Sequence, residues 1–78
     1  MAYVRLRIGA GSETRELYKE LKKQATTHCF CAWVRYYNDG FHDHIKMEDF
    51  CDNSDKMREA IGNVAAKLGI NYLMVEER

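Results

Sequence analysis

A turn signal near the middle of the chain constrains the fold more than any other feature of the sequence. Asn38, Asp39 and Gly40 follow a run rich in aromatic and β-branched residues (28–37) and precede a second candidate strand (41–50). An Asp-Gly pair readily adopts the positive φ angles that a tight hairpin turn requires. The sequence therefore predicts an antiparallel hairpin with Asp39 and Gly40 as its two loop residues.

Two amphipathic helices are predicted, one before and one after this hairpin in the sequence. After Ser12, a good N-cap, apolar residues recur at helical spacing to about Ala25. A second helix, capped by one of residues 52–54, runs to Leu68 and ends at Gly69. Each helix has one apolar stripe that must be buried against another layer. The stripes are Leu17, Tyr18, Leu21 and Ala25, and Met57, Ala60, Ile61, Val64, Ala65 and Leu68.

Two further candidate strands complete the pattern. Residues 3–8 alternate between apolar and polar side chains, and residues 70–75 are mostly apolar. The order β-α-β-β-α-β predicts a ferredoxin-like α+β fold, with a four-stranded antiparallel sheet and two helices on one face. Right-handed crossovers place the first and third strands in the centre. Residues 1–78 are expected to form a single compact domain, because the chain has no proline and no Gly/Ser-rich linker.

The face of the sheet opposite the helices holds the candidate binding residues. They form an aromatic and locally basic surface, and Trp, Tyr and Arg are enriched at binding hot spots. The same residue types stack on unpaired bases in RNA-recognition folds of this architecture, or simply pair across strands. On the fourth strand, Tyr72 and Met74 are assigned to this face and Leu73 and Val75 to the core. The predicted surface comprises Tyr3, Arg5, Arg7, Trp33, Arg35, Tyr37, His42, His44, Lys46 and Tyr72.

Charge and cysteine content exclude several classes of protein. With 12 basic and 12 acidic residues the formal net charge is zero, whereas duplex DNA-binding proteins usually have a basic excess. No run approaches the roughly 18 apolar residues of a membrane helix, and the N-terminus has no apolar signal core. Three cysteines, an odd number, are more typical of reduced thiols than of a secreted disulfide scaffold. We therefore expect a soluble, cytoplasmic protein with no membrane partner.

Metal binding is not expected. Histidines and cysteines occur together between residues 28 and 51, but Cys29 and Cys31 are separated by one residue. Zinc-binding pairs are usually separated by about two to four residues. The sequence thus predicts neither a metal nor a cofactor.

One local motif is similar to that of a known enzyme family. Residues 32–40, Ala-Trp-Val-Arg-Tyr-Tyr-Asn-Asp-Gly, resemble the Gly-Trp-Val-Arg-Asn-x-x-Asp-Gly stretch of acylphosphatases, which have the same fold. Gly11 and Arg15 have the Gly-x-x-x-Arg spacing of that family's phosphate loop, which implies a phosphate-binding role for Arg15. The Asn that orients the attacking water in the family is replaced here by Tyr36. Acylphosphatase-like hydrolysis is therefore a minor alternative, and no enzyme activity is expected.

The function that this sequence favours is stoichiometric binding to a larger protein or protein–nucleic-acid complex. Small proteins of this kind are common among regulators and among phage-encoded inhibitors of host machinery, anti-CRISPR proteins included. Such an inhibitor would act in the host cytoplasm. The alternative is a single-stranded RNA- or DNA-binding module that uses the same sheet face. A homodimer, formed through an edge strand or through stacked sheet faces, is a third possibility.

Overall fold

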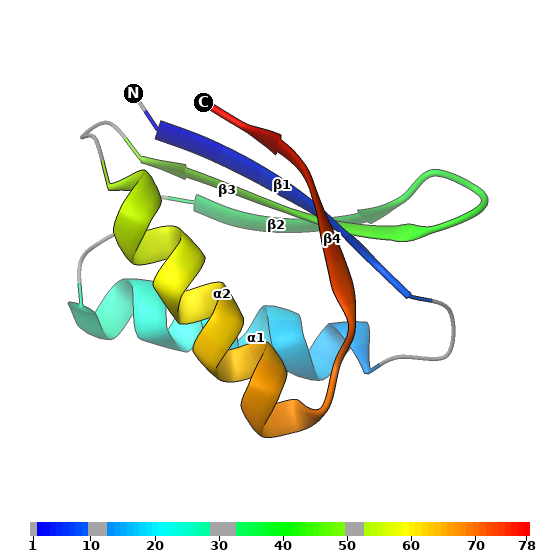
Figure 1. Cartoon of the computed structure of the whole chain (residues 1–78), viewed down its shortest axis with the longest axis horizontal. Helices are drawn as coiled ribbons and strands as arrows, with labels where there is room; N and C mark the ends of the chain where they lie inside the picture. The colour runs from blue at the N-terminus through cyan, green and yellow to red at the C-terminus, as the bar shows by residue number, and fades with distance from the viewer. Residues whose placement is uncertain (1, 10–12, 29–32, 50–52) are drawn as a thin grey trace.

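The structure, a computed structural model, describes residues 2–9, 13–28, 33–49 and 53–78. The helices and strands follow one another in the predicted order (Figure 1). Their bounds are β1 (Ala2–Ile8), α1 (Thr14–His28), β2 (Trp33–Asn38), β3 (Asp43–Asp49), α2 (Ser54–Leu68) and β4 (Tyr72–Glu77).

The strands form one antiparallel sheet in the order β2-β3-β1-β4. Both helices cover the same face of this sheet, and the other face is left open (Figure 1). The predicted ferredoxin-like fold, with the first and third strands in the centre, is confirmed. Backbone hydrogen bonds between Tyr3 and Arg78 hold the first and last strands together at the end of the sheet where the two termini lie.

The core lies between the helices and the covered face of the sheet. Along β1, every second residue from Ala2 to Ile8 is buried, which confirms the predicted alternation. The covering stripes include Leu17 and Leu21 from α1 and Ile61 from α2, all without solvent exposure. Burial of such side chains from water is the main favourable contribution to folding in a domain of this kind.

The helix ends agree only partly with the prediction. Gly69 adopts a left-handed conformation with φ +69°, and its N–H and that of Ile70 donate to the last turn of α2, as predicted for a C-terminal glycine. Leu68, the last residue of α2, was assigned to the apolar stripe but is 38% exposed. The α1 helix continues past Ala25 to His28, so the predicted start of the second strand at residue 28 is wrong. The Ser12 cap lies outside the described residues.

The hairpin has a longer loop than predicted. Asn38 pairs with Asp43, so residues 39–42 form a four-residue loop and the third strand begins two residues later than expected. Side chains on a strand alternate between faces, so a register shift of two residues leaves every side chain on its predicted face. The predicted partners are wrong, but the predicted faces of β2 and β3 are confirmed for the described residues.

The faces of β4 are the opposite of those predicted. Tyr72 pairs with Ile8 and Met74 with Leu6, so both lie on the core side, and Leu73 lies on the open face beside Arg7. A β-bulge then shifts the register between Arg5 and Leu6. Residues 72–75 are all apolar or aromatic, and no alternation in the sequence indicates which of them face the core.

Candidate binding site on the open face of the sheet

The open face is defined here as the sheet surface opposite the helices. All predicted binding residues except His42 and Tyr72 lie on it. His42 belongs to the hairpin loop, and Tyr72 packs against the core. The side chains of the open face are Tyr3, Arg5, Arg7, Trp33, Arg35, Tyr37, His44, Lys46, Glu48, Leu73 and Glu76.

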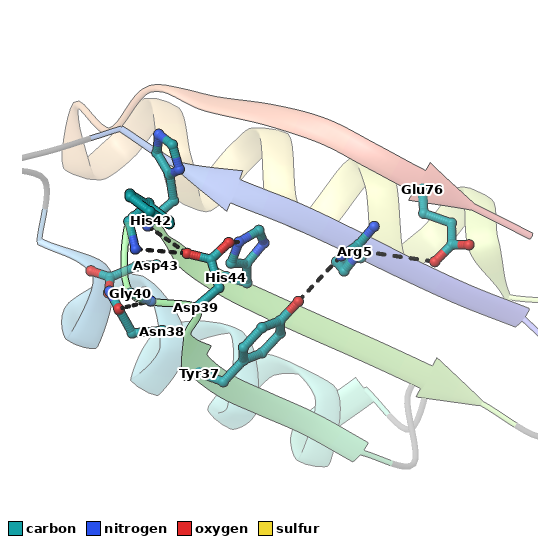
Figure 2. A network of polar contacts seen from close by, with 10 residues as sticks. Arg5, Tyr37, Asn38, Asp39, Gly40, His42, Asp43, His44 and Glu76 are labelled. Carbon is teal, nitrogen blue, oxygen red and sulfur yellow. Dashed lines mark hydrogen bonds and ion pairs between the residues drawn. The ribbon is translucent and has the colours of Figure 1, made fainter.

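The contacts at the centre of the open face converge on Tyr37, whose ring reaches over β3 from the edge strand β2. Its ring stacks on the imidazole of His44, with centroids 4.7 Å apart and planes inclined by 9°. The Lys46 ammonium lies 4.7 Å from the same ring centroid, a cation–π contact. The Tyr37 hydroxyl accepts a hydrogen bond of 3.3 Å from Arg5, on the far side of β3 (Figure 2). Tyr37 is thus held by three side chains of the protein itself.

Arg5 extends this network to the opposite edge of the sheet. Its Nε lies 3.8 Å from a carboxylate oxygen of Glu76 on β4 (Figure 2). This Nε is buried and has no hydrogen-bond partner among the described residues. The hydrogen bond to Tyr37 is the main cause that raises the pKa of Arg5. Tyr37, Arg5 and Glu76 therefore link β2, β1 and β4 in one row across the sheet.

His44 is on the predicted face but is not an exposed binding residue. It is 5% exposed, because Tyr37 covers its ring. Its Nε2 lies 2.8 Å from Oδ2 of Asp39, and its Nδ1 has no hydrogen-bond partner among the described residues. On the open face, His44 is therefore buried and supports Tyr37 and the hairpin loop.

Asp39 organises that loop. Its Oδ1 accepts hydrogen bonds from the backbone N–H of His42 (2.8 Å) and of Phe41 (2.9 Å). These two bonds, followed by the contact with His44, hold the pKa of Asp39 well below its usual value. The sequence pattern indicated Asp39 only as a turn residue. The signal for its further role is that Asp side chains commonly bond to backbone N–H groups two residues on.

The margins of the open face expose apolar side chains. Trp33 on β2 is 42% exposed, and Leu73 on β4 is 53% exposed. Val75, at the bulge in β4, is 41% exposed, and Phe41 at the hairpin tip is 87% exposed.

At the termini, the Arg78 guanidinium lies 4.7 Å from the ring centroid of Tyr3. Burial, followed by the nearby carboxylate of Glu76, raises the pKa of Tyr3.

Two arginines of the open face are not engaged by the other residues that the structure describes. Arg7 and Arg35 have no hydrogen bond or ion pair to any other described residue. Arg7 lies beside Leu73 and His44, and Arg35 lies beside Lys46. Their guanidinium groups are therefore available to an external carboxylate or phosphate.

A second polar cluster lies on the helical side of the hairpin. Asp43 accepts hydrogen bonds from Asn38 (2.7 Å), Thr14 (2.9 Å) and Tyr36 (3.2 Å). The bonds from Asn38 and Thr14 are the main causes that lower the pKa of Asp43. Tyr36 and Asp43 are diagonal neighbours across β2 and β3, since Tyr36 pairs with Ile45 and Asn38 with Asp43. This cluster joins the hairpin to the start of α1.

A hollow of about 270 Å³ lies beside this cluster. It is lined by Arg15, Tyr18, Lys19 and Tyr36. Arg15 and Tyr36, the two positions that the acylphosphatase resemblance singles out, thus line the same hollow. The Tyr36 hydroxyl is bonded to Asp43, and Gly11 of the resembling loop lies outside the described residues.

No protein-family model matches the chain, and no curated protein is similar enough to count as a relative. In the described part of the chain, no helix has the length and apolar character needed to cross a membrane. No three His, Cys, Asp or Glu side chains within the described ranges converge as ligands for a metal ion, and all three cysteines lie outside those ranges.

Proposed function

We propose that this protein is a non-enzymatic binding module whose open face docks stoichiometrically on a larger protein, alone or within a protein–nucleic-acid assembly. The observation that carries the proposal is the pattern of the open face. Exposed apolar side chains at its margins, Trp33 and Leu73 above all, surround a centre in which Tyr37 is fixed by its neighbours.

This pattern suits a protein partner for two reasons. Side chains that are already fixed lose little conformational entropy on binding, so more of the contact energy appears as affinity. Exposed aromatic and aliphatic anchors with arginines beside them have the composition of interface hot spots. In this role Arg7 and Arg35 meet carboxylates of the partner. An inhibitor of the anti-CRISPR type would act in this way, by covering a functional surface of its target.

Single-stranded nucleic acid is the second candidate, because Trp33, Arg7 and Arg35 offer one stacking surface and two cations. The contacts at the centre of the open face disfavour nucleic-acid binding. Base stacking on a sheet needs free aromatic rings, whereas Tyr37 is stacked on His44 and covered by Lys46. A protein partner is therefore the better proposal.

Affinity capture tests this proposal. The tagged full chain is incubated with a lysate of the organism in which it acts, with and without nuclease, and captured proteins are purified and titrated against it. We expect a defined complex of fixed stoichiometry that survives nuclease and that Trp33→Ala weakens. The matched control is Leu68→Ala, which removes an exposed apolar side chain from α2 rather than from the open face.

Salt dependence separates the two candidates. Affinity for a single strand falls by roughly 0.7 log units per neutralised phosphate for each tenfold rise in salt, whereas a mainly apolar protein interface depends much less on salt. Recovery of nuclease-sensitive material alone, with a steep salt dependence, would contradict the proposal and favour nucleic acid. Binding that Leu68→Ala weakens and Trp33→Ala leaves intact would move the interface to the helical layer.

A further inference from the structure

A hollow of about 250 Å³ lies at the end of the sheet where the β2–β3 loop meets the end of β1 and the start of β4. Leu73 and Tyr72 contribute its apolar wall, and Phe41 borders it from the hairpin tip. Arg7 and His42 contribute nitrogen-bearing side chains. Figure 2 shows His42 projecting from the loop toward the end of β1. The volume suits one or two side chains of a partner rather than a large ligand.

The hairpin tip is held in place before any partner binds. Asp39 accepts the backbone N–H groups of Phe41 and His42, and Asn38 accepts that of Gly40 at 2.7 Å. The Phe41 ring is nevertheless 87% exposed. An apolar ring in water on a backbone fixed by three hydrogen bonds is an unfavourable arrangement for the isolated protein, but one that lowers the entropic cost of docking.

The hollow has cationic character without an acidic side chain in its lining. Arg7 has no ion pair to another described residue, and the nearby carboxylate of Asp39 is engaged by His44 and by the loop. An arginine beside exposed leucine and phenylalanine side chains is complementary to a carboxylate that lies next to an apolar side chain.

From these observations we infer that this hollow is a subsite for an acidic–apolar segment of a protein partner. An apolar side chain of the segment packs against Phe41 and Leu73, and the carboxylate of a neighbouring Asp or Glu pairs with Arg7. The inference rests on the proposed function and specifies which part of the surface selects the partner. A nucleic acid suits the hollow less well, since a single guanidinium offers little to a chain of phosphates.

Selection from a random 12-residue peptide library displayed on phage tests the inference, with the full chain as bait. We expect enrichment of peptides with Asp or Glu within two positions of Leu, Ile or Phe. Phe41→Ser should lower the affinity for these peptides by about tenfold, the effect expected from the loss of one well-packed anchor. Arg7→Glu should reverse the charge preference, so that Lys or Arg replaces the acidic residue. The matched control is Lys23→Glu, which makes the same charge change at an exposed position of α1, on the helical side of the protein.

The outcomes separate this inference from the proposed function. No enriched motif, or peptides that bind equally well to Phe41→Ser and Arg7→Glu, would overturn the subsite. If Trp33→Ala nevertheless weakens binding of those peptides, the proposed docking through the open face is still supported. Binding of a 15-nucleotide oligo-dT, abolished by Phe41→Ser, would assign the hollow to nucleic acid and overturn the inference. Unchanged melting temperatures of the variants establish that each one is folded.

Discussion

A carboxylate oxygen of Asp39 and the Nε2 atom of His44 lie 2.8 Å apart, joining the exposed hairpin loop to a buried side chain of β3. The other oxygen of Asp39 holds the loop backbone, and the face of His44 supports Tyr37. One carboxylate thus fixes the hairpin tip and, through one imidazole, the centre of the open face. Both parts of the proposed binding surface depend on this contact.

The first prediction is that Asp39 contributes to the loss of stability in acid. Hydrogen bonds from the backbone of His42 and Phe41 lower its pKa in the folded state, whereas the unfolded chain has the ordinary value of about 3.9. The contribution is therefore complete above about pH 5 and is lost as the pH falls through 4 and below, because the unfolded state takes up a proton first. Urea unfolding from pH 7 to pH 2 measures this.

Asp39→Asn keeps an oxygen acceptor and removes the titration. We expect the variant to be less stable than the wild type at pH 7 and to lose less stability between pH 5 and pH 2. Asp43, whose pKa is also lowered by its hydrogen bonds, keeps part of the acid dependence in the variant. If the free energy of unfolding falls with pH in the same way in both proteins, Asp39 is not a source of the acid dependence.

The second prediction compares two glycines. Gly40 has φ +97°, where a side chain is strained although no other described residue lies within 4 Å of the Cβ position. Gly40→Ala should cost about 1–2 kcal/mol. Gly62 lies inside α2, and among the described residues an added Cβ there would meet the Tyr72 hydroxyl, at 3.8 Å, in ordinary van der Waals contact. Gly62→Ala should therefore stabilise the protein by about 0.5–1 kcal/mol. Chemical denaturation measures both, and changes of the same sign would contradict this reasoning.

The third prediction tests the faces of β4. Met74 packs against the core and pairs with Leu6, while Leu73 is 53% exposed. Met74→Ala should cost about 1–2 kcal/mol, less than truncation of a fully buried side chain, because Met74 is partly buried. Leu73→Ala should change stability by less than about 1 kcal/mol and instead weaken partner binding. The reverse order of stabilities would mean that the strand presents its other face to the core.

The fourth prediction concerns the centre of the open face. Tyr37→Phe removes the hydroxyl that bonds to Arg5 but keeps the ring over His44. Tyr37→Leu removes the ring as well, and should cost about 1 kcal/mol more than Tyr37→Phe, the usual value of an aromatic pair. Modification of His44 by diethylpyrocarbonate should be faster in Tyr37→Leu than in Tyr37→Phe. Equal modification rates would show that the Tyr37 ring does not protect His44.

Much of the site was predictable, because the alternation of apolar and polar residues along a strand assigns each side chain to a face of the sheet. This assignment does not require the pairing partners on the neighbouring strands to be known. Arg5, Arg7, Arg35 and Lys46 all lie on the predicted face, even though the hairpin register is two residues away from the expected one. An even shift preserves every face. Tyr72 was assigned wrongly because its strand is apolar at successive positions, so the sequence carried no alternation to follow.

The roles of individual residues depended on contacts that no local pattern encodes. Whether His44 is exposed depends on the direction of the Tyr37 side chain, which comes from a neighbouring strand. Likewise, Phe41 and Leu73 border one hollow although they are far apart in the sequence. Only the pairing of β1 with both β3 and β4 brings the hairpin and the fourth strand to the same end of the sheet.

The sequence by itself determined the order of the strands and helices, the two layers and the residues of the open face on three of the four strands. These properties follow from hydrophobic periodicity and turn residues, which act over a few positions along the chain. Only the tertiary structure decided the hairpin register, the faces of β4, the burial of His44 and the exposure of Phe41 beside Leu73. Those depend on the packing of side chains from separate strands, where small differences in fit decide which groups meet.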